Sequence, residues 1–335
     1  MTTKNQAAFE DEKIHLLRLP TPLHRMNYEC ENNLFIKRDD LTDFALGGNK
    51  ARMMEFFLKA VFDEKCDCLV AYGPAQSNLC RIVSAAAARY KRKCVLILEK
   101  SGMAHALMGN AIFTRLAGAE IIPVAVDEVV DTIDKTLDSL RKEGMNPYFI
   151  PGGGHSPLGI RSYVAAWQEI QQQSASAGLT FDYLFLATGT GTTQAGLLIG
   201  KTEDASETKI VGISIARKAE RGLTVLAEGF DQYSQLYGTT ISIPQEERIF
   251  EDRYVGGRYG KITPDIVKVI EDVYRTDSIV LDPIYTAKAF NGMIQYLECR
   301  AITGKNILFL HTGGLPGLFG TGASLIGHSD GSVTG

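Results

Sequence analysis

The sequence predicts an α/β protein built on parallel β-sheets. Short apolar runs rich in β-branched residues alternate with longer amphipathic runs, and this alternation is typical of strands joined by crossover helices. Several short runs, such as Ile210–Ile215, are apolar without internal alternation, as expected of strands that helices cover on both faces. The chain of 335 residues is long enough for one large or two medium domains.

The predicted elements begin with a helix that Asn49 and Lys50 open and that continues through the apolar run Met53–Leu58. Strands are predicted at Cys68–Tyr72, Cys94–Glu99, Ala119–Val124, Tyr183–Ala187, Ile210–Ile215 and Asn306–His311. Further helices are predicted at Asn78–Tyr90, His105–Leu116, Val129–Glu143, Thr193–Gly200, Pro264–Tyr274 and Tyr285–Ala301. Open parallel sheets bind ligands beyond the carboxyl ends of their strands, so the loops that follow strands are where chemistry is expected.

The composition argues against several classes of protein. Hydrophobic residues make up 45% and charged residues 22%, which is typical of a globular protein. The net charge of −4 comes without a basic patch, so we expect no nucleic-acid partner. No apolar run is long enough to span a bilayer, and the N-terminal segment lacks the apolar part of a secretory signal, so we expect a cytoplasmic protein with no membrane partner. The six cysteines lack the spacing of zinc or redox pairs, so we expect free thiols and no metal.

A loop after the strand Tyr183–Ala187 is the first candidate binding site. Its residues are Gly189, Thr190, Gly191, Thr192 and Thr193. Glycines let the backbone approach a ligand closely, and the amides and hydroxyls at a helix start suit a phosphate group. The alternative is a turn that only caps the following helix through a threonine. A dinucleotide-binding fingerprint would need a third glycine where Gln194 stands.

Lys50 is the second candidate. A charged extended segment leads into Gly47-Gly48, and Asn49-Lys50 then opens the apolar helix. A lysine at a helix start is electrostatically unfavourable, because the positive end of the helix dipole repels it. That position would help to depress the pKa of the amine, as an imine-forming lysine requires. The alternative is an ordinary surface lysine after a turn.

A third candidate lies after the strand Cys68–Tyr72, where Ser77 and Asn78 open an alanine-rich helix. The amides of this helix start could bind an anion. The alternative is that Ser77 or Asn78 serves only as the N-cap of the helix.

Together these segments resemble the fold-type-II (tryptophan synthase β-like) pyridoxal phosphate enzymes, and within them the 1-aminocyclopropane-1-carboxylate deaminase/D-cysteine desulfhydrase family. The resemblance runs almost from end to end of the chain. No single matching block is specific for the family, but the order and spacing of the blocks together are. The matching blocks are Leu19-Pro-Thr-Pro-Leu23, Lys37-Arg-Asp-Asp-Leu41, Gly47-Gly-Asn-Lys50, Gln76-Ser-Asn78, Thr190-Gly-Thr-Thr-Gln-Ala-Gly196, Tyr259-Gly260, Asp282-Pro-Ile-Tyr-Thr286 and His311-Thr-Gly-Gly-Leu-Pro-Gly317.

The resemblance implies two α/β domains, each with an open and mostly parallel sheet, and pyridoxal 5′-phosphate (PLP) between them. The large domain would comprise residues 1–51 and 159–335, and the small domain residues 52–158. A homodimer and a small amino-acid substrate are also implied.

The resemblance further assigns roles to individual residues. Lys50 would form a Schiff base with PLP, and Asn78 would hydrogen-bond its 3′-oxygen. The loop Gly189–Thr193 would bind the phosphate. Ser77, Asn78 and Leu79 would receive the substrate carboxylate, with Ser77 also acting in catalysis. Tyr259 and Tyr285 would take part in proton transfer, and Thr286 and Thr312 would contact the cofactor.

Two of these positions indicate the branch of the family. Deaminases of the cyclopropane amino acid carry Glu after the tyrosine and Leu after the C-terminal His, where this chain has Thr286 and Thr312. A carboxylate at the ring nitrogen keeps PLP a strong electron sink, whereas a hydroxyl leaves a milder one. We therefore expect D-cysteine desulfhydrase-like α,β-elimination of a small β-substituted amino acid, giving a 2-oxo acid and ammonia.

Two departures from the family pattern keep alternatives open. Leu79 stands where relatives usually have His or Gln, and Met53 where they usually have Lys. A more apolar substrate, β-replacement, racemisation or cyclopropane deamination are alternatives within the family. Outside it, the alternatives are a nucleotide-dependent oxidoreductase and a binding protein that has kept the fold without turnover.

Overall fold

The computed structural model describes residues 7–101 and 108–326 and contains two β-sheets. The larger has the order β1-β2-β10-β7-β8-β9, with β1 antiparallel to β2 and the other pairs parallel. The smaller has the order β5-β4-β3-β6 and is parallel throughout. The strands are β1 Leu23–Arg25, β2 Asn33–Arg38, β3 Cys68–Gly73, β4 Lys93–Glu99, β5 Glu120–Val124, β6 Pro147–Ile150, β7 Tyr183–Thr188, β8 Lys209–Ser214, β9 Ile249–Glu251 and β10 Asn306–His311.

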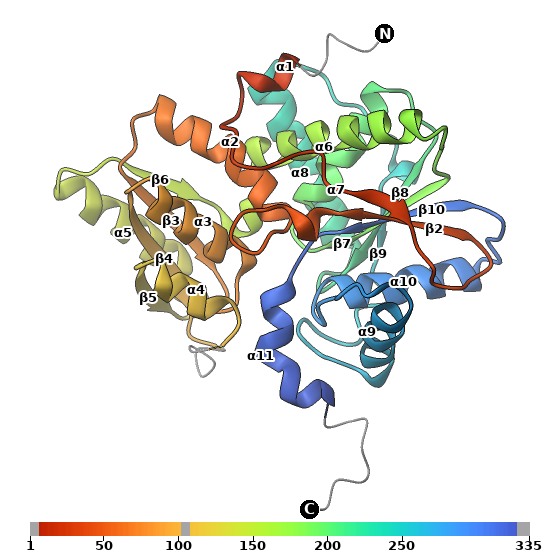
Figure 1. The fold of residues 1–335 in the computed structure, drawn as a ribbon. Helices are drawn as coiled ribbons and strands as arrows, with labels where there is room; N and C mark the ends of the chain where they lie inside the picture. Colours follow the sequence, from red (N-terminus) through yellow and green to blue (C-terminus); the bar gives the residue numbers. More distant parts are fainter. Residues whose placement is uncertain (1–6, 102–107, 327–335) are drawn as a thin grey trace, which may run out of the picture.

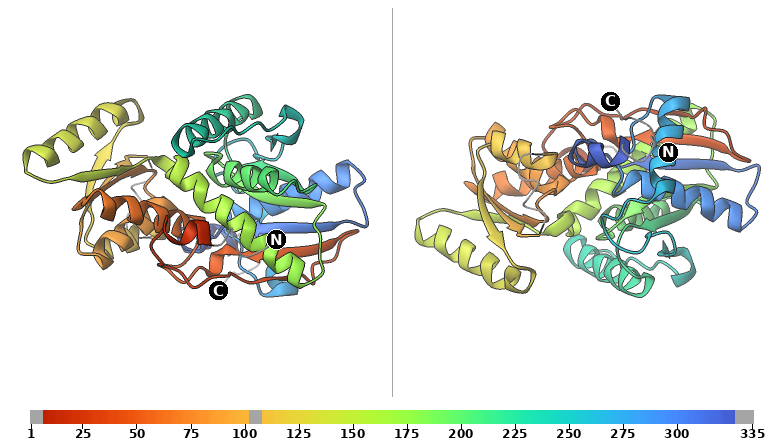
Figure 2. Two further views of the ribbon diagram at one scale, coloured as in Figure 1. Left: turned by 90° about the horizontal axis from the view of Figure 1, so that it is seen from above. Right: turned by 90° about the horizontal axis from the view of Figure 1, so that it is seen from below.

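Helices surround both sheets (Figure 1). They are α1 Ala7–Glu10, α2 Asn49–Asp63, α3 Asn78–Arg89, α4 Asn110–Leu116, α5 Val129–Lys142, α6 Pro157–Ser176, α7 Thr192–Glu203, α8 Ala219–Tyr237, α9 Pro264–Asp277, α10 Thr286–Cys299 and α11 Leu315–Ile326. Seen from above, the yellow-green α5 lies at one end of the molecule and the six-stranded sheet toward the other (Figure 2). No helix of the described residues is both long and apolar enough to cross a membrane.

The two-sheet architecture confirms the predicted fold class, and one predicted element needs correction. The helix expected at His105–Leu116 begins only at Asn110, because Gly109 has a φ of 53° and interrupts the helical backbone. Residues 105–107 lie outside the described residues. The sequence pattern also left α6 and α8 unassigned. The strands of the smaller sheet all lie within residues 52–158, while the exact domain boundaries stay a prediction.

The strands β7, β8 and β10 of the larger sheet are buried on both faces, which explains their largely apolar sequences. Leu184 and Leu308 face a core formed with α2, α6, α7 and α8. Phe185 and Phe309 face the opposite core, formed with α9 and α10. All four are at most 1% exposed, and each such side chain stabilises the fold by about 1.5–3 kcal/mol.

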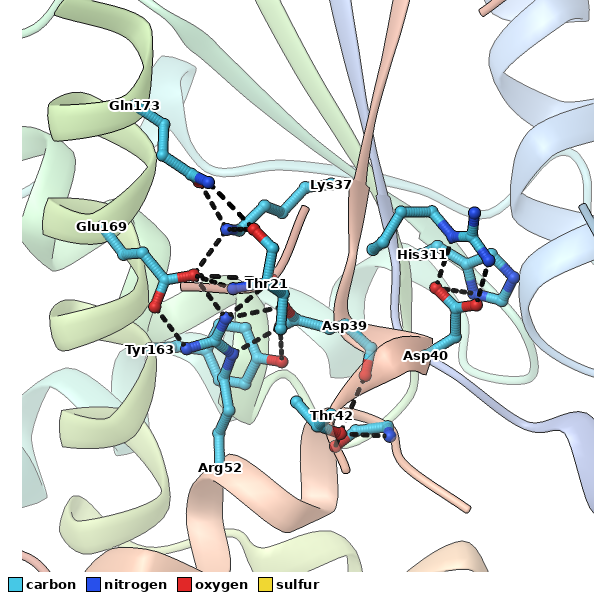
Figure 3. Close-up of polar contacts among 12 residues, drawn as sticks. Thr21, Lys37, Asp39, Asp40, Thr42, Arg52, Tyr163, Glu169, Gln173 and His311 are labelled. Atoms are coloured by element: carbon cyan, nitrogen blue, oxygen red, sulfur yellow. Dashed lines mark hydrogen bonds and ion pairs between the residues drawn. The ribbon is translucent and has the colours of Figure 1, made fainter. Parts of the chain in front are cut away.

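A buried network of charges anchors α2 to β2 and α6 (Figure 3). Arg52 donates to Asp39 at 2.7 Å and to Glu169 at 2.8 Å. Lys37 donates to Glu169 at 2.5 Å, and Tyr163 to Asp39 at 2.7 Å. Removing one partner from a buried network of this kind costs about 3–5 kcal/mol. Because Arg52 lies in the first turn of α2, the network fixes that end of the helix.

Candidate active site

A pocket of about 500 Å³ lies between the two sheets, at the carboxyl ends of β3, β7 and β8. It brings together all of the predicted site residues except Thr286: Lys50, Ser77, Asn78, Leu79, Gly189, Thr190, Gly191, Thr192, Thr193, Tyr259, Tyr285 and Thr312. A larger hollow of about 710 Å³ lies between the N-terminal segment and α6. It contains none of these residues, so we place the chemistry in the smaller pocket.

Lys50 lies in the first turn of α2, with its amine inside the pocket. Its Nζ donates to the carbonyl of Gly153 at 2.8 Å and lies 3.8 Å from Sδ of Met53. Among the described residues no carboxylate pairs with it. Burial lowers the pKa of Lys50 from 10.5 to about 8. The low pKa predicted for Lys50 is therefore supported, with burial as its cause. The alternative of a surface lysine is wrong, because Lys50 lines the pocket.

The threonine loop joins the end of β7 to α7, which begins at Thr192, one residue earlier than expected. Gly191 precedes the helix with a φ of 77°, a backbone conformation that glycine adopts without strain. The hydroxyls of Thr190 and Thr192 lie 3.0 Å apart, and Asn49 donates to the hydroxyl of Thr193 at 3.0 Å. The first amides of a helix have no partner within it, so this loop presents several donors to the pocket.

Ser77 is the N-cap of α3, since its hydroxyl accepts from the amide of Cys80 at 3.2 Å. The capping interpretation is thus correct, and the residue lines the pocket as well. The side-chain oxygen of Asn78 accepts from Asn110 at 2.9 Å. Leu79 is only 2% exposed and adds apolar surface to the same wall.

The hydroxyls of Tyr259 and Tyr285 lie 2.7 Å apart at another wall of the pocket. Burial raises the pKa of both phenols, so each keeps its proton at neutral pH and one can donate to the other. Thr312 also lines the pocket.

Thr286 does not line the pocket, which argues against its predicted contact with the cofactor. Its side chain is 0% exposed. The hydroxyl donates to the carboxylate of Asp282 at 2.8 Å and accepts from the amide of Asp282 at 2.8 Å. Thr286 therefore stabilises the start of α10, while its neighbour Tyr285 faces the pocket.

Among the lining residues that were not predicted, three have titratable side chains: Tyr72, Glu99 and Arg217. Tyr72 donates to Glu99 at 2.7 Å, and burial together with this bond raises the pKa of Tyr72 to about 12. Arg217 donates through Nη1 to the carbonyl of Gly189. All three lie at or just beyond the carboxyl ends of β3, β4 and β8, the positions where open sheets bind ligands. Although the three residues lie at or after the ends of predicted strands, they belong to no motif, so nothing in the sequence distinguishes them from other residues at strand ends.

Comparison with known proteins identifies the family. The family described as "Pyridoxal-phosphate dependent enzyme" matches residues 14–313. The chain belongs to this family. The family match decides against the nucleotide-dependent oxidoreductase that the sequence had left open.

Relatives within the PLP enzymes agree over nearly the whole chain. A 1-aminocyclopropane-1-carboxylate deaminase of Ralstonia pickettii is 32% identical over 312 residues, covering 89% of this chain and 91% of the relative. A D-cysteine desulfhydrase of Yersinia enterocolitica is 31% identical over 328 residues, covering 95% of this chain and 98% of the relative. A crystal structure of an ACC deaminase homologue superimposes with a TM-score of 0.89 at 31% identity, covering 98% of this chain and 99% of the homologue. These matches confirm the predicted family, fold class and cofactor.

The pocket of this PLP enzyme has the groups that PLP needs. An aldehyde bonds to a neutral amine, which the lowered pKa of Lys50 favours. A phosphate needs hydrogen-bond donors, which the loop Gly189–Thr193 provides. The hydroxyl of Thr188 is buried beside this loop without a partner among the described residues. A Cβ on Gly153 would lie 2.5 Å from the Thr190 side chain, so the backbone approaches the loop as closely as only glycine allows.

Proposed function

We propose that this PLP enzyme catalyses α,β-elimination of a small β-substituted amino acid, in the manner of a D-cysteine desulfhydrase, releasing a 2-oxo acid and ammonia. The observation that carries the proposal is that a buried Lys50 amine and the hydroxyl pair of Tyr259 and Tyr285 share one small pocket. A base and an acid are the two groups that removal of a Cα proton and of a β-substituent requires. Relatives named D-cysteine desulfhydrase and 1-aminocyclopropane-1-carboxylate deaminase support this reaction type.

We assign the cofactor-holding roles as follows. Lys50 would bond the PLP aldehyde, Asn78 would bind the 3′-oxygen, the loop Gly189–Thr193 would hold the phosphate, and Thr312 would face the ring nitrogen. Thr286 is left out because its hydroxyl is bonded to Asp282. When bound, PLP withdraws electrons from the Cα atom of an amino acid joined to it.

The remaining residues handle the substrate. The hydroxyl of Ser77 and the first amides of α3, at Asn78 and Leu79, would bind the carboxylate, because a helix start attracts anions. Lys50, freed when the substrate amine takes its place, would remove the Cα proton through Nζ. The Tyr259–Tyr285 pair would donate a proton to the leaving group, since both phenols hold their protons. Apolar Leu79 would help to exclude water from the reacting atoms.

The lack of a glutamate at position 286 favours elimination over cyclopropane ring opening. The deaminases of the cyclopropane amino acid carry Glu there, where this chain has Thr286, and a threonine hydroxyl, whether of Thr286 or of Thr312, cannot hold a proton on the ring nitrogen as a carboxylate would. Elimination needs less carbanion stabilisation, because the leaving group departs from the adjacent carbon. Deamination of the cyclopropane amino acid, β-replacement and racemisation are therefore outcomes that the assay must distinguish.

The test is a panel of substrates given to the purified holoenzyme: D- and L-cysteine, D- and L-β-chloroalanine, and 1-aminocyclopropane-1-carboxylate. We expect 2-oxo acid and ammonia from at least one β-substituted amino acid and none from the Lys50→Ala variant. Oxo acid from the cyclopropane amino acid alone would replace elimination by ring opening. Spectral changes without release of oxo acid or ammonia, or exchange of the Cα proton alone, would overturn the proposal.

We further infer a cytoplasmic homodimer with the domain boundaries predicted above. All six cysteines are free thiols, which a reducing compartment favours. Leu116 on α4 and Phe319 on α11 are 78% and 68% exposed, and these two helices contact each other. An exposed apolar surface of this kind is typical of a subunit interface. Sedimentation of the holoenzyme, compared with a Leu116→Glu/Phe319→Glu variant, tests the dimer, which a monomeric wild type would contradict.

A further inference from the structure

Three basic side chains converge on the threonine loop. Arg217, just after β8, lines the pocket and donates to the carbonyl of Gly189 at the start of the loop. A ring nitrogen of His155 lies 3.2 Å from the hydroxyl of Thr192. Lys50 enters from α2. Burial lowers the pKa of His155, and the nearby charges of Arg217 and Lys50 lower it further, which indicates that the three groups are close in space.

Acidic side chains do not neutralise this cluster. Glu228 is near enough to act on both Arg217 and His155, but it already pairs with Arg221 at 3.1 Å. Among the described residues that line the pocket, Glu99 is the acidic one, and it accepts a hydrogen bond from the hydroxyl of Tyr72. Within the described part of the chain, no carboxylate comes within 4 Å of the Arg217 guanidinium.

Only one of the three groups can offer a positive charge to the phosphate while PLP is bound, since the Lys50 nitrogen would be joined to the aldehyde carbon. His155 is neutral near pH 7 because its pKa is lowered. Lys50 must be neutral to bond the aldehyde. Met53, which contacts the Lys50 amine, contributes a thioether and no charge. Arg217 remains, and a guanidinium suits a phosphate because its planar set of donors matches the phosphate oxygens.

We propose that Arg217 is the cation that binds the phosphoryl group of PLP and makes the site prefer PLP to unphosphorylated pyridoxal. This inference rests on the proposed role of the loop Gly189–Thr193 as the phosphate site. The buried hydroxyl of Thr188, which lines the same pocket without a partner in the described residues, is a second group available to that anion. The dipole of α7 supplies only about half a positive charge, against the nearly two negative charges of a phosphate ester at neutral pH.

The experiment compares the affinities of the apoprotein for PLP and for pyridoxal, measured by absorbance titration, in the wild type and in Arg217→Gln. Loss of charge-assisted hydrogen bonds should weaken PLP binding about 10- to 100-fold. Binding of pyridoxal should change less than about twofold, because it has no phosphate. Inorganic phosphate should bind to the pyridoxal-loaded wild type and shift the ³¹P resonance, and this shift should be lost in Arg217→Gln.

Lys218→Gln is the matched control, because it removes one positive charge from the exposed residue next to Arg217, and Lys218 lies near Asp252 rather than near a pocket residue; it should leave the preference for PLP unchanged. Arg217→Lys keeps the charge and should retain most of the preference, and it serves as the test if Arg217→Gln fails to fold. Equal weakening of PLP and pyridoxal in both Arg217 variants would overturn the proposal, since Arg217 would then only support the loop through Gly189. If the wild type bound neither aldehyde, the cofactor site itself would be misassigned.

Discussion

The buried amine of Lys50 should make the stability of the apoprotein depend on pH in a specific range. The perturbation is Lys50→Met, which keeps a long unbranched side chain and removes the titrating group. In the wild type the amine lies against Gly153 and Met53, and no carboxylate of the described residues pairs with it, so folding transfers a charge out of water without an opposite charge beside it. The variant removes that cost.

The magnitude follows from the lowered pKa. The pKa of Lys50 is about 8, against 10.5 for an ordinary lysine, and each tenfold change in proton affinity corresponds to about 1.4 kcal/mol. Below pH 8 both folded and unfolded chains hold the proton, so the charged amine costs the fold a constant amount of about 3 kcal/mol. Between pH 8 and 10.5 the folded chain loses the proton while the unfolded chain keeps it. The cost therefore disappears as pH rises through this range.

The assay is urea unfolding of both apoproteins at several values between pH 7 and 10.5. We expect the variant to gain stability over the wild type near pH 7, and this difference in unfolding free energy to shrink by about 3 kcal/mol by pH 10.5. Other groups that titrate at high pH are common to both proteins and cancel in the difference. Lys50→Leu packs differently but should show the same pH-dependent part. A difference that stays constant with pH in both variants would refute the desolvated amine.

Three further predictions concern the other parts of the site and its support. Ser77→Ala should lower kcat/KM about 10- to 100-fold while changing the Kd for PLP much less. Equal losses of kcat/KM and of PLP affinity would mean that Ser77 acts on the cofactor. Ser77→Thr, which keeps the hydroxyl, is the control. Tyr259→Phe removes one hydroxyl of the pair with Tyr285 and should lower kcat about 10²- to 10⁴-fold, with little change in PLP affinity by titration. Glu169→Gln should destabilise the fold by about 3–5 kcal/mol at pH 7. Burial alone would raise the pKa of Glu169, but the charges of Arg52 and Lys37 lower it to about 2. Urea unfolding should therefore show the stability difference between wild type and variant shrinking as the pH falls from about 4.5 to 2.

Much of the fold was predictable because the strands carry their own signal. The run Asn306–His311 was predicted with the bounds of β10, since a strand buried on both faces is apolar throughout. The helix α6 was missed, although Ser156 and Pro157 are a recognisable start. Its buried side chains face α2, α7 and α8, so the apolar residues do not form the single stripe by which amphipathic helices are found.

The site was predictable only as far as sequence motifs reach. Glycine-rich turns and helix starts predicted Lys50, Ser77 and the loop Gly189–Thr193. The same reasoning could not separate Tyr285 from Thr286, because which of two neighbours faces a pocket depends on packing at the start of α10. Arg217 belongs to no motif, and its relevance follows only from the approach of β8 to β7 in the sheet.

The placement of Lys50 and its low pKa come from different parts of the structure. The position of the amine is set by anchors on both sides: Gly48 and Asn49 donate to the carbonyls of Asp39 and Thr312 at 2.9 Å, and Arg52 holds the next turn through Asp39 and Glu169. The pKa instead depends on the burial of Nζ in the pocket. A change in the network should therefore lower global stability without moving the pH range in which Lys50 titrates. We expect the network to oppose any movement of the start of α2 that would release this amine to solvent, because the charged amine costs the fold about 3 kcal/mol.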